Sequence, residues 1–332
     1  MRHSSHTRHR GGVWRPELLL GIAILGAVPA CNPPAEDASP RTYVYKQVAD
    51  LEIRADVYNG GDGPIRPVAV WIHGGALIMG RRESVPPRLR DQLLQAGFAV
   101  VSIDYRLAPE TKLPAILEDV EDAFDWIRNQ GPALFRADPE RVVVLGSSAG
   151  GYLTLATGYR VEPRPLALVS FWGYGDLIGP WYSTPSPHER HHRVVMTREE
   201  ALGQVSGPPI SNASDRPGNG GAFYQHCRQH GIWPREVSGW DPHNEAERFA
   251  PYMPALNVTP DYPPTLLVHG TVDTDVPYEQ SVLMQQQFLK HGVRHELMTF
   301  EGAEHGLGGA LATALAQAHS AAVNFVQVRA VR

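Results

Sequence analysis

A serine within the run Gly-Ser-Ser-Ala-Gly at 146–150 is the first candidate for chemistry in this chain. The apolar run 141–145 precedes it and an apolar, helical pattern over 151–157 follows it, which indicates strand, sharp turn and helix. Small residues on both sides of Ser148 allow the strand and the helix to approach closely at such a turn. The five-residue pattern alone arises often by chance, so the strand before it carries much of the argument. Ser148 is therefore a candidate nucleophile.

A serine hydroxyl needs a base to take its proton, and that base needs a carboxylate to orient it and to stabilise its cation. His305 follows the apolar run 296–300, and Asp273 follows the apolar run 265–268. Asp275 lies in the same loop as Asp273 and has the same side chain. Ser148, Asp273 and His305 could thus supply a nucleophile, an acid and a base, in that chain order. No metal or cofactor is needed for such chemistry.

The elements that must position these side chains alternate along the chain. Short apolar runs typical of buried parallel strands occupy 68–72, 99–103, 142–145, 166–170, 265–268 and 296–300. Apolar residues at three- and four-residue steps predict helices over 88–96, 116–129, 150–159, 279–291 and 311–328. Alternation over 43–58 predicts an antiparallel pair of strands at the sheet edge. The pattern predicts an α/β fold with a doubly wound, mostly parallel sheet, spanning 43–332.

One long segment interrupts the alternation. Residues from about 173 to 262 are rich in Gly, Pro, His and Trp, with helical patterns only over 197–204 and 221–230. Loops of this length inside a domain usually form a lid or a small cap. We therefore expect an inserted cap over the carboxyl ends of the strands, where ligands bind in open α/β sheets.

The first thirty residues differ in kind from the rest. Basic residues without acids precede an apolar run over 18–27, which is too short to span a bilayer comfortably. This pattern predicts a signal peptide over 1–30, followed by a flexible tether over 31–42. Cys31 stands where bacterial lipoprotein signals place the cysteine that becomes lipidated, which favours an exported protein of the bacterial envelope or periplasm, anchored to the membrane by lipid. A plain signal cleaved after Ala30 is the alternative.

Composition narrows the possible partners. The formal net charge is −5 and the basic residues form no stripe, so we expect no nucleic acid partner. Cys31 and Cys227 are the two cysteines, so a lipidated Cys31 leaves no disulfide, and a zinc site built from cysteines is excluded. The histidines at 188, 191 and 192 lack the spacing to carboxylates of known metal sites. Oligomeric state is left open.

Several separate motifs, in order, resemble the hormone-sensitive-lipase-like branch of the α/β-hydrolases, which includes bacterial acetyl esterases and carbohydrate esterases. They are His-Gly-Gly-Ala-Leu-Ile-Met-Gly at 73–80, Asp-Tyr-Arg-Leu-Ala-Pro-Glu at 104–110, the turn at Ser148, Asp273, and His305. The resemblance implies that Asp273, which has the family's spacing before Val-Pro at 276–277, is the acid rather than Asp275. It also implies an oxyanion hole formed by the N–H groups of Gly75, Ala76 and Ala149.

Other polar and aromatic residues near strand ends have structural interpretations. We expect Asp104 and Arg106 to pair with each other, and His73 and His269 to hold turns. The aromatic residues at 172, 174, 181 and 182 fit a wall for an acyl or sugar group and fit packing inside the cap equally well.

The sequence predicts a serine hydrolase of short-chain carboxylic esters, with acetylated carbohydrates among the possible substrates and water as the second substrate. A serine peptidase or aminopeptidase of the same fold is one alternative. A binding module without catalysis is another, although such a module has no use for an intact nucleophile, acid, base and oxyanion loop.

Overall fold

The computed structural model describes residues 39–61 and 63–331. The predicted signal peptide, Cys31 and most of the predicted tether lie outside these residues. Within the described part of the chain, no helix is both long and apolar enough to cross a membrane. The first strand begins at Arg41, two residues before the predicted edge pair.

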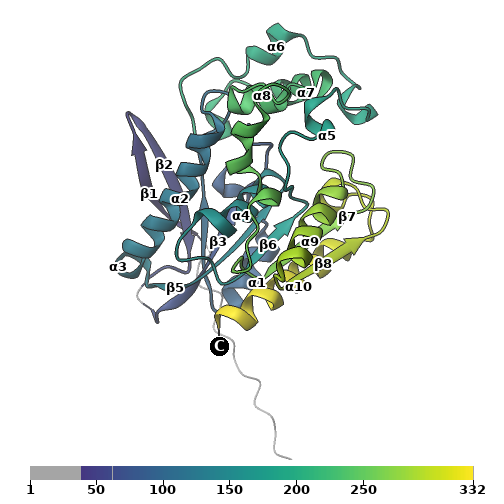
Figure 1. Ribbon diagram of the computed structural model, residues 1–332. Coiled ribbons are helices and arrows are strands. Elements are labelled where there is room, and N and C mark those ends of the chain that lie inside the picture. Colours follow the sequence, from purple (N-terminus) through teal and green to yellow (C-terminus); the bar gives the residue numbers. More distant parts are fainter. Residues whose placement is uncertain (1–38, 62, 332) are drawn as a thin grey trace, which may run out of the picture. The chain divides into compact units, whose positions relative to one another are not determined.

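The described residues include one eight-stranded sheet with the order β1-β2-β4-β3-β5-β6-β7-β8 (Figure 1). The antiparallel edge consists of β1 (Arg41–Val48) and β2 (Leu51–Tyr58), and β2 also runs antiparallel to β4. The remaining pairs are parallel. They join β3 (Arg66–Ile72), β4 (Ala99–Ile103), β5 (Ala137–Ser147), β6 (Leu168–Phe171), β7 (Thr265–Gly270) and β8 (His295–Phe300).

The central strands are buried on both faces, which explains why they are continuous apolar runs. One face of the sheet packs against α1 (Pro87–Gln95) and α10 (Ala314–Ala330). The other face packs against α2 (Leu113–Asn129), α4 (Ala149–Arg160) and α9 (Glu279–His291). The fold is the predicted doubly wound α/β arrangement, and all the predicted strands and helices outside the insertion are present. The short helix α3 (Gly131–Phe135) was not predicted.

The inserted segment leaves the sheet after β6 and returns at β7. It contains α5 (Pro180–Ser183), α6 (Arg198–Leu202), α7 (Gly221–His230) and α8 (Trp233–Ser238), with several 3-10 turns between them. In Figure 1, α6, α7 and α8 lie together at the top of the molecule, beyond one end of the sheet. The two helical patterns predicted in this segment correspond to α6 and α7.

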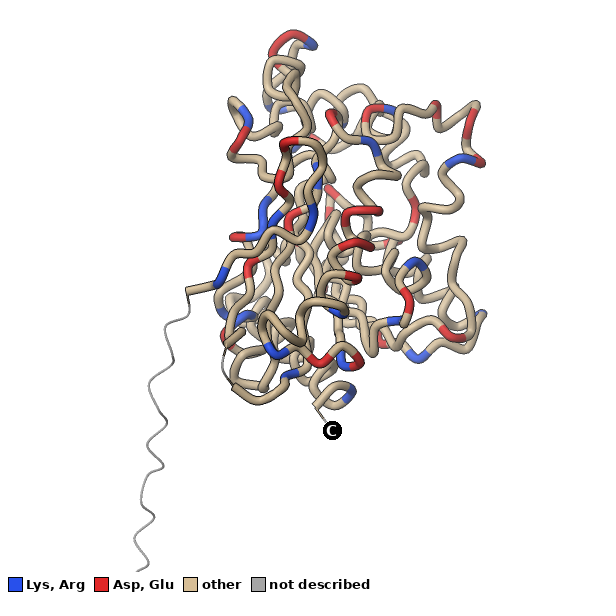
Figure 2. Tube along the Cα trace, turned by 90° about the vertical axis from the view of Figure 1, so that its left-hand side faces the viewer, with Lys and Arg blue, Asp and Glu red and all other residues tan. Residues whose placement is uncertain are grey.

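Acidic and basic residues are interspersed over the fold (Figure 2). Near the end of β4, the predicted pairing of Asp104 with Arg106 is wrong. Arg82 binds Asp104 instead, with Nη1 2.6 Å from Oδ2, and Arg106 binds Asp119, with Nε 2.7 Å from Oδ2. Residues 104 and 106 lie beyond the end of β4, where each side chain packs against a different element and binds a partner there. Both pairs are structural, as expected of their positions.

Candidate active site

Ser148 lies at a strained turn between β5 and α4. Its φ is 55° and its ψ is −121°, a conformation that side-chain-bearing residues rarely adopt. The flanking glycines permit the turn, because a Cβ on Gly146 would overlap the carbonyl group of Gly150, and one on Gly150 would overlap the carbonyl oxygen of Ile72. The Ser148 N–H donates to the carbonyl oxygen of Phe171 at 2.9 Å, which fixes the turn to β6.

His305 lies between Ser148 and Asp273. Its Nε2 is 3.2 Å from the Ser148 Oγ, and its Nδ1 is 2.7 Å from Oδ2 of Asp273. A proton on Nδ1 donates to the carboxylate and leaves Nε2 free to accept the serine proton. The three candidate residues come from the ends of β5, β7 and β8, so the parallel sheet brings together side chains that are up to 157 positions apart.

The Asp273 carboxylate is buried and well supplied with donors. Its Oδ1 accepts from the N–H groups of Asp275 and Val276, each at 2.9 Å, and its Oδ2 also lies 3.3 Å from Nε2 of His269. Burial raises the pKa of Asp273, but hydrogen bonds from His269 and His305 outweigh burial and lower it to about 2. Asp273 therefore carries a negative charge at neutral pH.

Competing effects also act on His305. Burial lowers its pKa, but the hydrogen bond to Asp273 and the negative charges of Asp275 and Asp273 outweigh that effect, and the net pKa is raised above 6.5. Such a histidine holds a transferred proton more readily than a free imidazole does.

The predicted oxyanion residues belong to two segments that lie next to Ser148, the loop after β3 and the start of α4. A Cβ on Gly74 would come within 3.2 Å of the Ser148 Cβ, so the loop after β3 passes directly beside the nucleophile. Gly75 and Ala76 follow with φ of 111° and 55°, and Ala149 begins α4. Among the described residues, the N–H groups of Gly75, Ala76 and Ala149 have no acceptor. They are available to a substrate oxygen.

The side chains of His73 and His269 are buried, and each contacts a backbone carbonyl oxygen of a loop beside the site. The His73 ring stacks on Tyr105 at a centroid distance of 4.3 Å and contacts the Gly74 carbonyl oxygen at 2.8 Å, and burial lowers its pKa to about 4. Nε2 of His269 donates to the Val276 carbonyl oxygen at 3.0 Å. Both therefore support the loops that carry candidate residues.

The insertion is anchored to both sides of this site by buried side chains. Trp233 of α8 donates from Nε1 to the Ala76 carbonyl oxygen at 2.9 Å. Arg228 of α7 donates from Nη1 to the Asp275 carbonyl oxygen at 2.9 Å. Arg216 pairs with Glu110, and the two side chains are only 3% and 4% exposed. These anchors make the insertion an integral part of the site rather than a loose flap.

None of the anchoring residues was identified from the sequence. Each lies in the irregular insertion, far along the chain from its partner, and no local pattern marks it. The one available signal was Arg228, a charged residue within the helical pattern predicted over 221–230.

The aromatic residues at the start of the insertion divide into two groups. Tyr174 and Tyr182 are buried and pack inside the cap, with Tyr182 stacked on Trp233 at a centroid distance of 4.0 Å. Trp172 instead presents its ring to His305 at 6.2 Å. Trp181 stacks on Tyr182 and stays partly exposed. Cap packing thus accounts for the two tyrosines, and Trp172 is the one of the four that borders the candidate base.

The histidines at 188–192 contact protein groups. Nδ1 of His191 lies 2.9 Å from Oε1 of Gln225, and Nε2 of His192 lies 2.6 Å from the Ser186 carbonyl oxygen. Within the described residues, no cluster of three or more His, Cys, Asp or Glu side chains has the arrangement of a metal site.

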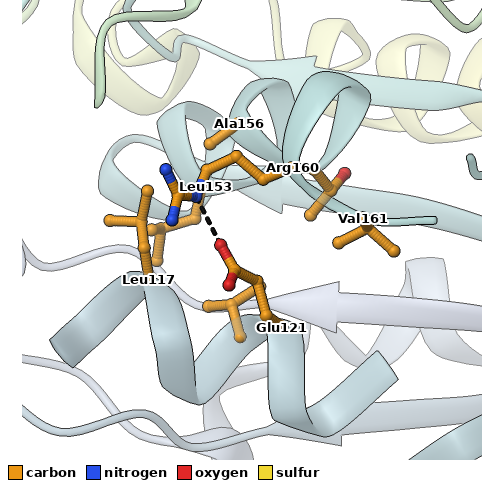
Figure 3. Close-up of a pocket in the computed structure, with 8 residues that line it drawn as sticks. Leu117, Glu121, Leu153, Ala156, Arg160 and Val161 are labelled. Atoms are coloured by element: carbon orange, nitrogen blue, oxygen red, sulfur yellow. Dashed lines mark hydrogen bonds and ion pairs between the residues drawn. The ribbon is translucent and has the colours of Figure 1, made fainter. Parts of the chain in front are cut away.

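A small cavity lies between α2 and α4, away from the three candidate residues (Figure 3). Leu117 and Leu153 line it, and Glu121 pairs with Arg160 across it. The space open to the centre of a water molecule is about 10 Å³, near the minimum that admits one water. This cavity is too small for a substrate.

Two family models match the chain. A model described as the alpha/beta hydrolase fold matches residues 69–204, which include Ser148 and the loop after β3. A model of the prolyl oligopeptidase family matches residues 222–328, which include Asp273 and His305.

Solved structures of other proteins have the same fold, and curated sequences are similar to this chain. Thermogutta terrifontis esterase 2 is 22% identical, with a TM-score of 0.61 over 89% of this chain and 96% of that structure. An acetyl ester-xyloside bifunctional hydrolase from Caldicellulosiruptor lactoaceticus is 21% identical, with a TM-score of 0.60 over 84% of this chain and 89% of that structure. A non-reducing polyketide synthase of Preussia isomera is 28% identical over 80% of this chain, which spans only 12% of that synthase. Its sheet topology and these matches show that the chain has the α/β-hydrolase fold.

Proposed function

We propose that this protein is a serine hydrolase of short-chain carboxylic esters. The observation that carries the proposal is the contact of His305 with Ser148 on one ring nitrogen and with Asp273 on the other, at 3.2 and 2.7 Å. Such an arrangement supplies a nucleophile, a base and an orienting carboxylate without a cofactor.

In the first half of the reaction, Ser148 Oγ attacks the ester carbonyl carbon as its proton moves to Nε2 of His305. The carbonyl oxygen becomes an oxyanion and accepts hydrogen bonds from the N–H groups of Gly75, Ala76 and Ala149. The tetrahedral centre then expels the alcohol, which takes the proton from His305. An acyl group remains on Ser148.

In the second half, a water molecule gives a proton to Nε2 and attacks the acyl carbon. The second tetrahedral centre breaks its bond to Ser148, which recovers a proton from His305, and the carboxylic acid leaves. The raised pKa of His305 suits this cycle, because the ring must hold a proton transiently in both halves.

The substrate class rests on two supports. The names of the two similar solved structures include an esterase and an acetyl ester hydrolase, which favours ester bonds with small acyl groups. The insertion is also packed against both sides of the site, and the Trp172 ring at its start lies 6.2 Å from the ring of His305, so we expect the space beside Ser148 to be restricted. Acetylated carbohydrates remain candidate substrates.

A serine peptidase is the second candidate, because the prolyl oligopeptidase model matches the part of the chain that contains Asp273 and His305. The matched residues do not include Ser148. Peptide anilides and p-nitrophenyl esters, assayed side by side, separate the two candidates, since a peptidase cleaves the anilides efficiently and an esterase scarcely cleaves them.

For location, we propose export to the bacterial envelope with a lipid on Cys31. Acyl chains on one cysteine give stable anchoring without a spanning helix. Replacement Cys31→Ser should move the protein from the detergent-soluble envelope fraction to the soluble fraction or block its processing. Unchanged fractionation and mass would support a plain signal instead.

Labelling with a fluorophosphonate probe tests the nucleophile directly. The wild-type protein and a Ser147→Ala control should be labelled, and Ser148→Ala should not. The same variant should lose ester hydrolysis by a factor of about 10⁴ to 10⁶. Labelling that persists in Ser148→Ala, or that disappears in Ser147→Ala, would assign the nucleophile elsewhere.

A further inference from the structure

A second carboxylate, Asp275, lies beside the candidate base. Its Oδ2 is 3.8 Å from Nε2 of His305, the nitrogen that faces Ser148. This distance is too long for a hydrogen bond and short enough for a strong charge interaction. Asp273 acts on the opposite side of the ring, so His305 lies between two negative charges.

The insertion surrounds this carboxylate. Tyr224 of α7 donates its hydroxyl proton to Oδ1 of Asp275 at 2.6 Å, and His191 and Arg228 lie 3.3 and 3.7 Å from the same oxygen. Arg190 lies 3.8 Å from Oδ2. Among residues 39–61 and 63–331, the polar partners of Oδ1 all belong to the insertion, and Oδ2 lies between Arg190 of the insertion and His305.

These contacts argue against two other roles for Asp275. It cannot orient His305 as Asp273 does, because it faces the nitrogen that must accept the serine proton. It is also a poor site for a positively charged group of a substrate, because the side chain is only 11% exposed and Arg190 and Arg228 already balance its charge. Burial raises the pKa of Asp275, but His191, His305 and the two arginines outweigh it and hold that pKa far below its ordinary range.

We propose that Asp275 is a positioning residue through which the packed insertion sets how strongly His305 holds a proton. The proposal rests on the proposed function, in which His305 is the base. The Asp275 carboxylate stabilises the imidazolium that forms when Ser148 loses its proton. Arg190 opposes this effect, and Tyr224 and Arg228 fix the carboxylate in place.

The charged groups around His305 act with opposite signs. Asp273 and Asp275 raise the pKa of His305, and Arg190 lowers it. Arg190 also binds Glu304, the residue before His305, at 3.3 Å. Neutralising Asp275 and neutralising Arg190 should therefore move the titration of His305 in opposite directions.

NMR titration of the His305 ring in the full-length protein measures this effect without relying on activity, and a His305→Gln variant assigns the signal. Asp275→Asn should lower the midpoint by about half a pH unit or more, the scale of one charge about 4 Å away in water. Arg190→Gln should raise the midpoint. The acid limb of kcat/KM for ester hydrolysis should shift with the midpoint in each variant.

Two further variants keep the test decisive if Asp275→Asn fails to fold. The Arg190 side chain is 39% exposed, so Arg190→Gln is expected to fold. Tyr224→Phe releases Oδ1 while the negative charge of Asp275 stays, so the midpoint should shift less than in Asp275→Asn.

Midpoints that do not move, or that move in the same direction in Asp275→Asn and Arg190→Gln, would overturn the proposal. Because the titration needs no substrate, it can fail while fluorophosphonate labelling of Ser148 succeeds. Absence of labelling in the wild type would instead refute the proposed function.

Discussion

The indole Nε1 of Trp233 donates a hydrogen bond to the carbonyl oxygen of Ala76 at 2.9 Å. Ala76 and the next residue, Leu77, both have positive φ values of 55° and 60°. Each non-glycine residue in such a conformation costs about 1 to 3 kcal/mol. A buried side chain of the insertion thus helps to hold the strained loop that passes beside Ser148.

Replacement Trp233→Phe should lower kcat about tenfold while KM changes little. The phenyl ring keeps most of the packing but loses the donor, so the oxyanion loop loses an external support that matters most in the transition state. Steady-state kinetics on p-nitrophenyl acetate measure the effect, with melting temperature as the check on folding. Trp240→Phe, at a tryptophan that packs on Phe249 in the same insertion, is the matched control. An equal fall in kcat in Trp233→Phe and Trp240→Phe would indicate that the packing of the insertion, rather than the hydrogen bond to Ala76, is responsible.

The pH dependence of kcat/KM should show an acid limb with a midpoint above 6.5. His305 must be neutral to accept the serine proton, and its pKa is raised, so activity falls as the pH decreases through that raised value. A profile from pH 5 to 9 on a pH-insensitive ester measures it. A midpoint well below 6.5, or a flat profile, would contradict a base in this environment.

Asp273→Asn should reduce kcat/KM at pH 8 by about 10⁴, because an amide at this position favours the wrong tautomer of His305. Asp275→Asn should cost about tenfold or less at the same pH, since that residue faces the other ring nitrogen at 3.8 Å. Measurement on the alkaline side of the acid limb separates a loss of catalysis from a shift in the titration of His305. A larger loss at Asp275 would reverse the two assignments.

Acyl chains of about two to four carbons should be preferred over longer ones. Each added methylene of the substrate strengthens binding by roughly 1 kcal/mol where the acyl pocket has space for it. Where the pocket is closed, the longer chain does not fit. A series of p-nitrophenyl esters from acetyl to octanoyl tests this, and kcat/KM that rises steadily along the series would indicate an open groove. Trp181→Ala should extend the tolerated length with acetate turnover largely retained, while Trp240→Ala should not.

Asp119→Ala should destabilise the fold by about 3 to 5 kcal/mol, because it leaves two cations without a buried partner. The Asp119 side chain is fully buried and binds Lys46 and Arg106, each at 2.7 Å. Asp122 binds the same lysine but is 47% exposed, so Asp122→Ala should cost about 1 kcal/mol or less. Urea unfolding of the two variants measures the difference, and similar losses would show that burial does not decide the outcome here.

The strands and helices that could be predicted from the sequence are those whose pattern of apolar residues follows directly from their burial. The valine-rich runs of β3 and β4 lie between two layers of helices, so nearly every position is apolar and the strands stand out. Ser148 stood out for a related reason, since the close approach of β5 and α4 at that turn requires Gly146 and Gly150.

Contacts of the insertion with the site could not be predicted. Arg228 and Asp275 are 47 positions apart, and neither residue carries a local pattern that points to the other. The wrong pairing of Asp104 with Arg106 has the same origin, because opposite charges two positions apart look complementary in a sequence. Their partners, Arg82 and Asp119, are chosen by the packing of neighbouring elements.

The buried bond from Arg228 to the loop that holds Asp275 has a consequence for how this enzyme can change. The insertion begins and ends on adjacent strands, so exchanging it for another cap leaves the sheet intact. A new cap without an equivalent of Arg228 would remove the hydrogen bond to the Asp275 carbonyl oxygen as well as the residues that border the substrate. Under the proposed function, substrate scope and the titration of His305 are therefore coupled, and a useful cap exchange must carry its own support for the loop that holds Asp273 and Asp275.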